Sequence, residues 1–451
     1  MNADQLDTQW RRYTGVPPTT VDLLVEHGHF DLVVDAARQG EWFCAQRAVR
    51  ELSARGRQGE AWELMAPYVA SGWWGAVQAG ARLLDGWGRS EEALALVRGY
   101  TGSEERLAWD ETARLLAGLG RPDEAITLLR PHLQDWFLLQ ALAEATAGHG
   151  RDREVIALLE PLAERKLRTG EPHNGVVMLA RVLDRAGRTD DAVALVRGHL
   201  AANERCVYQN DAEELAALFA RHDRFEDLYT LAATARYADP ASRPLVDRLV
   251  ELDRADKAVA FLRSADHDGA GWAGGRLVSL LGRLGRLDEA VDAAGPVLQR
   301  ASCACLLGEL LDRLVAAGRA ELALEVLDGA SAGNRIIAED MDYAWPWLLS
   351  EAGRHEEAIA AERARPEDAY GRARGLAGAL EAAGRVDEAL AVLENAGATH
   401  SDTRTERARL LILAGRAQDA VAVLRAPEPD RMYTTDDAWG PPPGYTAEPP
   451  V

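Results

Sequence analysis

The chain has 451 residues, of which 47% are hydrophobic and 27% are charged, and a formal net charge of -21. This balance is typical of a folded protein and excludes a disordered polypeptide, while so negative a chain disfavours direct binding to nucleic acid or to anionic membranes. Four cysteines are too few for a disulfide framework. The N-terminal sequence MNADQLDTQWRRY has no apolar core of a signal peptide, and no run of about 18 apolar residues occurs, so we expect a cytoplasmic protein without a membrane segment.

Residues 1–39 predict an N-terminal helical cap, and the phrase Gly-Arg-x-(Asp/Glu)-(Asp/Glu)-Ala then recurs along residues 40–425 at intervals of 30 to 37 residues. Clear copies begin at Gly88, Gly120, Gly187, Gly285, Gly353 and Gly384, and weaker copies begin at Gly56, Gly150, Asp223, Asp253, Gly318 and Gly415. An outlying copy at Gly28 is a candidate thirteenth. Recurrence at such a period is typical of a protein built from stacked structural repeats.

Each position of the phrase has a physical interpretation. The first residue, Gly in ten copies and Asp in two, predicts a left-handed conformation that ends a helix. The second residue is always Arg, a cation that a helix C-terminus favours. Ser, Thr or Asp and paired acids then suit the start of a second helix. The sixth residue, Ala in ten copies, predicts that two helices approach closely there.

The residues before each phrase predict a first helix. Ten copies have Leu four residues before the Gly or Asp, and Ala and Leu recur seven and eight residues before it, which places these side chains on one helix face. Each repeat is therefore expected to be a helical hairpin that buries its apolar faces only by stacking on its neighbours.

At these positions the chain resembles the tetratricopeptide repeat family. Leu179, Ala180, Leu183, Gly187 and Ala192 match the family's pattern, and residues 376–389 match it again. The resemblance implies an all-α, right-handed α-solenoid of about 12–13 stacked hairpins. It also implies that the first helices line a concave groove for partners, and that the residue six before the Gly faces this groove.

That position predicts the partner-binding residues Arg50, Arg82, Arg114, Arg181 and Trp347. Arg binds carboxylates with two parallel hydrogen bonds, so an acidic segment of a protein or peptide is the expected ligand. The alternative is that Arg82 and Arg181 form ordinary pairs within their helices, with Asp85 and Asp184 three residues on. Trp347, in the sequence Trp345-Pro346-Trp347, is the aromatic candidate for a contact.

Three further features are expected to shape the hairpins. Helix breakers stand eleven residues after the Gly in seven copies, where we expect the second helix to be shortened or kinked: Pro67, Gly99, Pro131, Pro161, Gly198, Pro296 and Gly329. Aromatic residues stand fourteen residues before the Gly in four copies, where packing at the start of the first helix is the favoured role: Trp42, Trp74, Trp136 and Tyr370. Irregular connections are expected around 163–175, 200–212, 232–245 and 266–275.

Several short motifs are weighed against simpler explanations. Gly269-x-Gly271-x-x-Gly274 has the spacing of a dinucleotide loop but no predicted strand beside it, so a connection between hairpins is preferred. Cys303-x-Cys305 lacks a second ligand pair and predicts helix-packed thiols. His27-Gly28-His29 predicts a solvated turn. We find no catalytic constellation, no phosphate loop and no metal-ligand set in the sequence, and expect no cofactor.

Residues 426–451 contain seven prolines and no helical period, which predicts a disordered acidic tail. Taken together, the sequence predicts a protein- or peptide-binding scaffold that is not an enzyme, does not bind nucleic acid directly and has no metal or cofactor. The alternative is a regulatory or sensor module that responds to a peptide or acts with a separately encoded enzyme or transcription factor, as related bacterial arrays do. The oligomeric state stays open.

Overall fold

The computed structural model describes residues 2–12, 15–100, 104–169, 175–202, 209–234, 237–267, 271–300, 304–366, 371–396 and 401–426. In these ranges the regular elements are helices, α1 to α28 and one short 3-10 helix, and there is no strand. The predicted all-α fold is confirmed. The expected tail from residue 427 onward lies outside the described residues, as do Gly269, Cys206, Cys303 and Tyr370.

The helices form two compact units, which are described separately. Unit 1 comprises Met1–Asp4, Met65–Ala317 and Val326–Ala338, and unit 2 comprises Gln5–Leu64, Gly318–Glu325 and Glu339–Val451. Unit 2 is therefore discontinuous in sequence, because its two long segments flank unit 1. The division predicted from the sequence, into cap, array and tail, stays a prediction.

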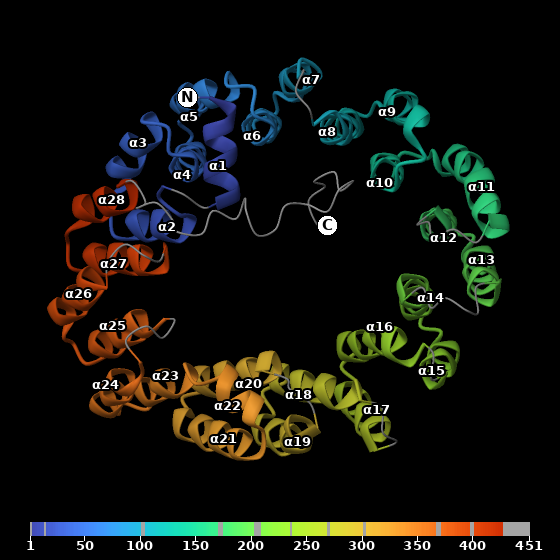
Figure 1. The fold of residues 1–451 in the computed structure, drawn as a ribbon. Coiled ribbons are helices and arrows are strands. Elements are labelled where there is room, and N and C mark those ends of the chain that lie inside the picture. The colour runs from blue at the N-terminus through green and yellow to red at the C-terminus, as the bar shows by residue number, and fades with distance from the viewer. Residues whose placement is uncertain are drawn as a thin grey trace. The chain divides into compact units, whose positions relative to one another are not determined.

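Unit 1 is a stack of helical hairpins in two layers. The first helices are α6 Trp74–Gly86, α8 Glu105–Gly118, α10 Trp136–Ala145, α12 Gly175–Arg185, α14 Gln209–Arg221, α16 Ala238–Glu251, α18 Ala273–Arg283 and α20 Ala304–Ala316. The second helices are α7 Ser90–Arg98, α9 Pro122–Leu129, α11 Asp152–Thr169, α13 Thr189–Ala202, α15 Phe225–Ala233, α17 Ala255–His267 and α19 Leu287–Arg300. Within this unit, Figure 1 shows α10, α12, α14 and α16 on the inner side of an arc and α11, α13, α15 and α17 on its outer side.

Unit 2 contains hairpins from both ends of the chain. Its helices are α2 Pro18–Glu26, α3 Phe30–Arg38, α4 Trp42–Ala54, α23 Ala344–Glu351, α24 His355–Ala364, α25 Arg372–Ala382, α26 Val386–Asn395, α27 Ser401–Leu413 and α28 Ala417–Arg425. Four helices cross the boundary between the units: α1 Ala3–Arg12, α5 Gln58–Val69, α21 Ala320–Gly333 and α22 Arg335–Asp340. Helices α2 and α3 flank the turn at Gly28 like the twelve other pairs, so the described residues make the thirteen hairpins that the sequence predicts.

The first residue of every phrase has the predicted left-handed conformation. The φ angle is positive at Gly28 and at all twelve regular positions, including Asp223 (φ 53°) and Asp253 (φ 57°). In ten of the twelve regular copies the Arg that follows donates its backbone N–H to the carbonyl of the Leu or Phe five residues earlier, for example Arg89 to Leu84 at 2.9 Å. This is the hydrogen bond of a Schellman turn, which satisfies the end of the first helix before the second begins.

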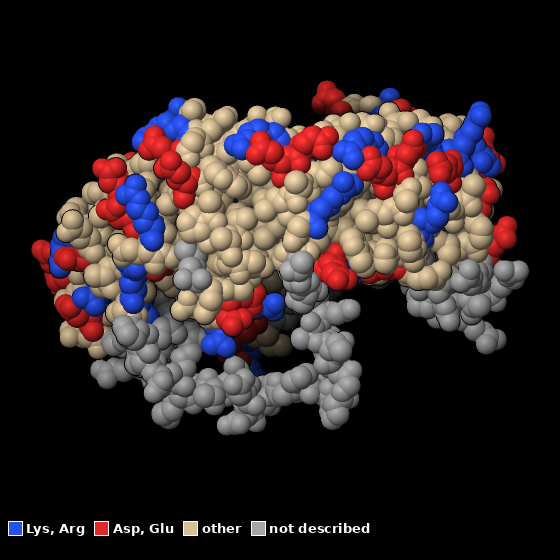
Figure 2. All heavy atoms as spheres, turned by 90° about the horizontal axis from the view of Figure 1, so that it is seen from above, with Lys and Arg blue, Asp and Glu red and all other residues tan. Residues whose placement is uncertain are grey.

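The Arg side chains do more than the predicted favourable contact with a helix end. In nine copies the guanidinium pairs with the acid three residues later, as in Arg89–Glu92 (2.6 Å) and Arg385–Glu388 (2.6 Å). In six copies it also reaches an acid of the preceding hairpin, as in Arg286–Asp256 (2.7 Å). Figure 2 accordingly shows basic and acidic side chains next to one another on the face that it draws. Isolated exposed pairs contribute little to stability, but here they link successive hairpins in one register.

The sixth residue of the phrase, Ala in ten copies, is fully buried in each regular hairpin. Its side chain has no exposed area in any of the twelve copies: Ala61, Ala93, Ala125, Val155, Ala192, Leu228, Ala258, Ala290, Ala323, Ala358, Ala389 and Ala420. The prediction of a close helix approach is consistent with this burial.

The predicted shortening of the second helix occurs at two of the seven positions and not at the other five. Gly99 is the C-cap of α7, and α9 ends before Pro131, which lies in the 3-10 helix Arg130–His132. Helices α5, α11, α13, α19 and α21 continue past their Pro or Gly. Tertiary packing of the apolar face outweighs the local cost of a breaker there. Residues 238–245 are likewise helical rather than irregular. Pro240 lies in the first turn of α16, where a proline is tolerated, and α16 continues past Pro244 inside it.

The predicted role of the tryptophans fourteen residues before the Gly is supported. Trp42, Trp74 and Trp136 are the first residues of α4, α6 and α10. Trp42 and Trp74 are buried, with 1% and 7% exposure, and Trp136 is partly buried. These side chains therefore pack where each first helix begins.

Two glycines of one hairpin predict opposite effects of the same substitution. Gly187 lies in the left-handed turn (φ 77°), whereas Gly198 is an exposed residue inside α13, where a methyl group would meet only open space. We expect Gly187→Ala to destabilise the protein by about 1 kcal/mol, and Gly198→Ala to stabilise it by about 0.5 to 1 kcal/mol. Urea unfolding followed by far-UV circular dichroism measures both; equal midpoints for the two variants would contradict the assignment of the turn.

Candidate functional site

The surface made by the first helices of the hairpins, the first-helix face, carries the residues that the sequence singled out. Arg82 on α6, Arg114 on α8 and Arg181 on α12 are exposed there. Arg50 on α4 is exposed, and Trp347 on α23 is partly buried. Arg50 and Trp347 belong to unit 2 and the other three to unit 1, so the structure does not define them as one continuous site.

Arg82 and Arg114 both bind a carboxylate inside the chain. Glu111 on α8 is completely buried, and it accepts hydrogen bonds from Arg82 (3.1 Å), from Arg114 (2.7 Å) and from Gln78 (3.2 Å). A buried carboxylate without such partners would be strongly destabilising. The two guanidinium groups therefore have a structural role between neighbouring first helices.

Arg181 repeats this arrangement one stage further along unit 1. Its guanidinium pairs with Glu214 on α14 at 2.9 Å, and the Glu214 side chain is only 5% exposed. Arg82 and Arg181 thus pair with carboxylates of neighbouring helices, and not within their own helices as the alternative explanation proposed. Asp85 binds Ser90 and Arg114, and Asp184 binds Thr189, His222 and Arg221.

The neighbouring carboxyl group titrates in an unusual range. Burial raises the pKa of Asp110 to about 6, with further contributions from the charges of Glu111 and Glu144. Burial also acts on Glu111, but the hydrogen bonds from Arg82 and Arg114 outweigh it and hold the pKa of Glu111 below its usual range. The two adjacent carboxyl groups on α8 are thus driven in opposite directions.

A hollow opens on the first-helix face of unit 1, over α16, α18 and α20. Its volume is about 490 Å³, and its walls are formed by Arg243, Val246, Asp247, Gly275, Arg276, Ser279, Leu280, Arg283, Cys305, Leu306 and Glu309. Two of these residues, Asp247 and Ser279, stand six residues before their Asp253 or Gly285. In these two copies, the residue at the position that the resemblance assigned to the groove therefore lines a concave surface.

The hollow combines an apolar floor with loosely held arginines. Val246, Leu280 and Leu306 supply the apolar part. Arg243 lies 3.6 Å from Glu213 and Arg283 lies 3.4 Å from Asp247, and the two side chains are 66% and 50% exposed. These separations are longer than those of ordinary charge-assisted hydrogen bonds, so both guanidinium groups have N–H donors that can bind a ligand.

Arg276 and Glu309 are held more firmly at the same place. Arg276 pairs with Asp239 at 2.6 Å and lies over the ring of Trp272. Glu309 accepts from Ser279 at 2.9 Å and from Arg313 at 2.9 Å. The firmly paired residues fix the wall of the hollow, and Arg243 and Arg283 remain adjustable.

Sequence reasoning missed this hollow, although its signal was present. The copies from Asp253 to Gly318 have no Arg six residues before their Gly or Asp, so the sequence pattern indicated the arginines nearer the N-terminus instead. Arg243, Arg276 and Arg283 stand at other positions of the same helix face. Cys305 was expected to be helix-packed but is exposed on α20, because it faces the hollow rather than the neighbouring helix.

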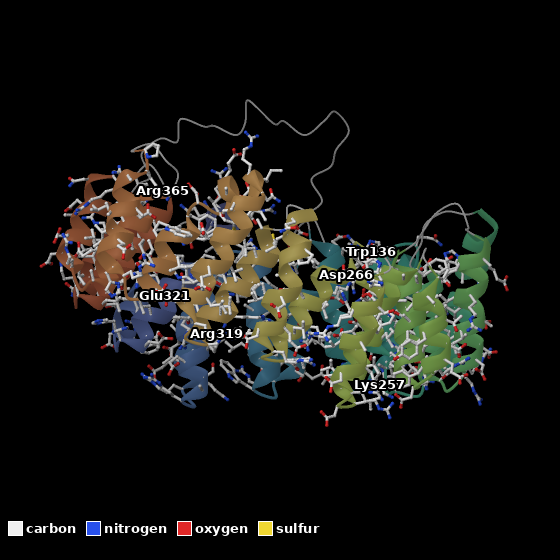
Figure 3. All side chains as sticks on the ribbon, turned by 90° about the horizontal axis from the view of Figure 1, so that it is seen from below. Trp136, Lys257, Asp266, Arg319, Glu321 and Arg365 are labelled. Carbon is white, nitrogen blue, oxygen red and sulfur yellow. The ribbon has the colours of Figure 1, made fainter. Side chains whose placement is uncertain are left out.

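Within the glycine motif, Gly274 has a packing role. The described residues on either side are helical: α17 ends at His267 and α18 begins at Ala273. A methyl group on Gly274 would lie 2.6 Å from Val297 and 2.8 Å from the carboxylate of Asp266. Figure 3 shows Lys257 and Asp266 near the two ends of α17. Gly274 thus allows α18 to approach α17 and α19 closely.

Other chemical features of the described chain are few. His27 and His29 flank the left-handed Gly28 in the expected turn. Among the described residues, no group of three or more His, Cys, Asp or Glu side chains could hold a metal ion. None of the described helices has both the length and the apolar character needed to cross a membrane.

The thirteen hairpins define the class: the chain is an α-helical repeat protein of the tetratricopeptide-like type. No family model and no curated protein matches it. Solved structures that resemble it include that of Naa15/Naa10 bound to HypK-THB, with 15% identity over 84% of this chain and 62% of that chain and a TM-score of 0.31. The others are APC/C Cut9-Hcn1 (12%, 89% and 91%, TM-score 0.25) and the pentatricopeptide repeat protein PPR10 from maize (16%, 90% and 72%, TM-score 0.32). The class follows from the chain's own hairpins and not from these likenesses.

The pKa of Asp110 predicts a pH-dependent gain from its replacement. Because the folded state raises this pKa above the unfolded value of 3.8, ionised Asp110 destabilises the fold fully above about pH 6 and progressively less as the pH falls toward 4. We expect Asp110→Asn to raise the unfolding free energy by on the order of 2 kcal/mol at pH 7.5 and hardly at all at pH 4. Exposed Asp328, changed to Asn, is the control and should show no such difference; an equal gain at both pH values for Asp110→Asn would contradict the assignment.

Proposed function

We propose that the chain is a binding scaffold that holds an extended protein or peptide segment on the first-helix face of unit 1, at the hollow over α16, α18 and α20. The observation that supports this best is the combination, in one concave surface, of an apolar floor with the loosely paired guanidinium groups of Arg243 and Arg283. Binding sites are typically concave and largely apolar, with a few polar groups that fix orientation.

The chemistry of the hollow favours a ligand with a carboxylate next to an apolar side chain. Arg243 and Arg283 would leave their weak partners and form parallel hydrogen bonds with the carboxylate. Leu280 on α18 and Leu306 on α20 would cover the apolar side chain. The hollow extends over three successive first helices, α16, α18 and α20, which suits an extended peptide.

Electrostatics favours a peptide over a nucleic acid. The chain carries a net charge of -21, and binding to a phosphate backbone depends on a surplus of basic groups. Most arginines described above are already paired with acids of the chain. A single short carboxylate needs only the two adjustable guanidinium groups of the hollow.

The partner-binding role of the residues predicted from the sequence stays a prediction, and their contacts favour the hollow as the binding site instead. A ligand carboxylate at Arg82, Arg114 or Arg181 would compete with Glu111 or Glu214, which are buried and need these partners. Arg50 has no ion pair among the described residues and remains available on α4. The alternative function, a regulatory module, would use the same first-helix face. Such a regulator would act by presenting or releasing the bound peptide segment.

An immobilised peptide array tests the proposal. Its peptides pair Leu with Asp or Glu, and matched peptides replace the acid by Asn or Gln. We expect the wild-type chain to retain the acidic peptides selectively, and the double variant Arg243→Gln/Arg283→Gln to lose at least about tenfold in affinity, because two charge-assisted hydrogen bonds are removed.

The matched control is Arg98→Gln/Arg130→Gln, which removes two exposed arginines that pair with Glu124 and Glu154 on the second-helix side. This variant should bind like the wild type. Equal retention by the two double variants, or no preference of the wild type for acidic peptides, would overturn the proposal.

A further inference from the structure

The two ends of the chain meet inside unit 2 in the same way as successive hairpins do. First helix α25 packs against first helix α27, and first helix α2 packs against first helix α4. Between them α27, the last first helix, packs against α2, the first of the hairpin helices. Figure 1 shows α2 beside α27. The stack of unit 2 therefore continues from the C-terminal hairpin to the N-terminal hairpin without a covalent link.

A polar clasp holds this terminal joint. Arg425, the last residue of α28, donates to Glu41 at 3.1 Å and also to the side-chain oxygen of Gln39. The second carboxylate oxygen of Glu41 accepts the backbone N–H of Val16 at 3.2 Å. The Glu41 side chain thus connects three parts of unit 2: the segment before α2, the start of α4 and the end of the last helix.

Glu41 is built into the joint rather than lying on a free surface. Its side chain is 11% exposed. A methyl group on Gly15 would overlap Glu41 Oε2, and Gly15 has a φ of +82°, so the chain passes this carboxylate where only glycine fits. A protein is strongly destabilised when the cation that pairs with one of its buried carboxylates is removed. Opening of the joint therefore requires a replacement partner for Glu41.

We propose that the terminal joint is a releasable interface, and that the two end faces it covers bind the corresponding faces of a second copy of this chain. One face is formed by α27 and the end of α28, and the other by α2 and the turn between α3 and α4. The two faces are complementary, since each covers the other within one chain. A second copy supplies Glu41, Gln39 and α2 in the same geometry. Exchange therefore keeps every contact of the joint, including the buried pair.

The balance between closed and joined chains is set by concentration. Within one chain, the two ends are tethered and their effective concentration is high, so the closed form prevails in dilute protein. At high protein concentration the same contacts form between copies. The contact is head-to-tail, and two copies that exchange both ends close into a dimer.

Cross-linking of separate chains tests this. The background replaces Cys206, Cys303 and Cys305 by Ser and keeps Cys44, which is buried and whose thiol pKa is raised by that burial. One chain carries Gln39→Cys and a second, differently tagged chain carries Arg425→Cys. They are mixed at low and at high concentration and treated with a short bis-maleimide.

We expect a cross-linked heterodimer whose yield rises with protein concentration. A chain with both substitutions should cross-link within itself at low concentration, which shows that the reagent spans the joint. A third mixture, of Gln39→Cys with Arg416→Cys, is the control for random collision, because Arg416 lies at the opposite end of α28; it should give no heterodimer.

The exchange rate of Arg425→Ala is the second measurement. The clasp is present in both the closed and the joined forms, so its loss should leave the dimer fraction at equilibrium unchanged. It should at least double the rate at which differently tagged chains exchange, relative to Arg416→Ala, which removes only an exposed pair with Asp419. Absence of a heterodimer at every concentration, or a heterodimer yield equal to that of the collision control, would overturn the proposal. A double-cysteine chain that never cross-links within itself would overturn the joint itself.

Discussion

The left-handed residue at the turn of each hairpin, with the arginine that follows it, is the constraint on which the array depends. The turn ends the first helix through the hydrogen bond from the Arg N–H to a carbonyl five residues back. The same Arg precedes the second helix directly. Its side chain reaches the acid three residues on in nine copies, and an acid of the hairpin before it in six copies. One dipeptide therefore sets the angle within a hairpin and the register between hairpins. Asp223 and Asp253, the two described residues other than Gly with positive φ, show that the conformation is retained even where the favoured residue is absent.

The first-helix face shows how an acidic chain can still present cations. Where a first helix buries a carboxylate, as at Glu111 and Glu214, the arginines of the neighbouring helices bind it and become part of the stack. Over α16 to α20 no such buried carboxylate takes up Arg243 and Arg283, and their long contacts with exposed acids leave them adjustable. Recognition on this face therefore depends on which arginines are not needed for packing, and the number of arginines alone does not reveal it.

The sequence predicted what is local and periodic, and it failed where the outcome depends on distant residues. Helix type, the thirteen turns and the buried sixth residue of each phrase follow from a pattern that spans about ten residues. The predicted shortening at Pro67 and Pro161 was wrong, because packing on a neighbouring hairpin continues α5 and α11 beyond these residues. The partners of Arg82 and Arg181 could not be assigned, since Glu111 and Glu214 lie on the next first helix, 29 and 33 residues away. Arg425 and Glu41 are 384 residues apart, a separation at which no periodic pattern in one sequence indicates contact.

In a stacked array the two end faces are the costly surfaces, because each terminal hairpin has an apolar side without a neighbour. Unit 2 resolves this with the chain's own termini: α2 has α4 on one side and α27 on the other. The short helix α1 contributes little burial of its own, with Leu6 as its one buried residue, and is held through Gln9, which bonds the backbone of Gly40 and Trp42. What covers the end faces is thus mainly the other end of the stack. A surface whose best partner is encoded in the same chain is satisfied equally well by a second copy, so the stability of the array and its capacity to associate have one physical origin.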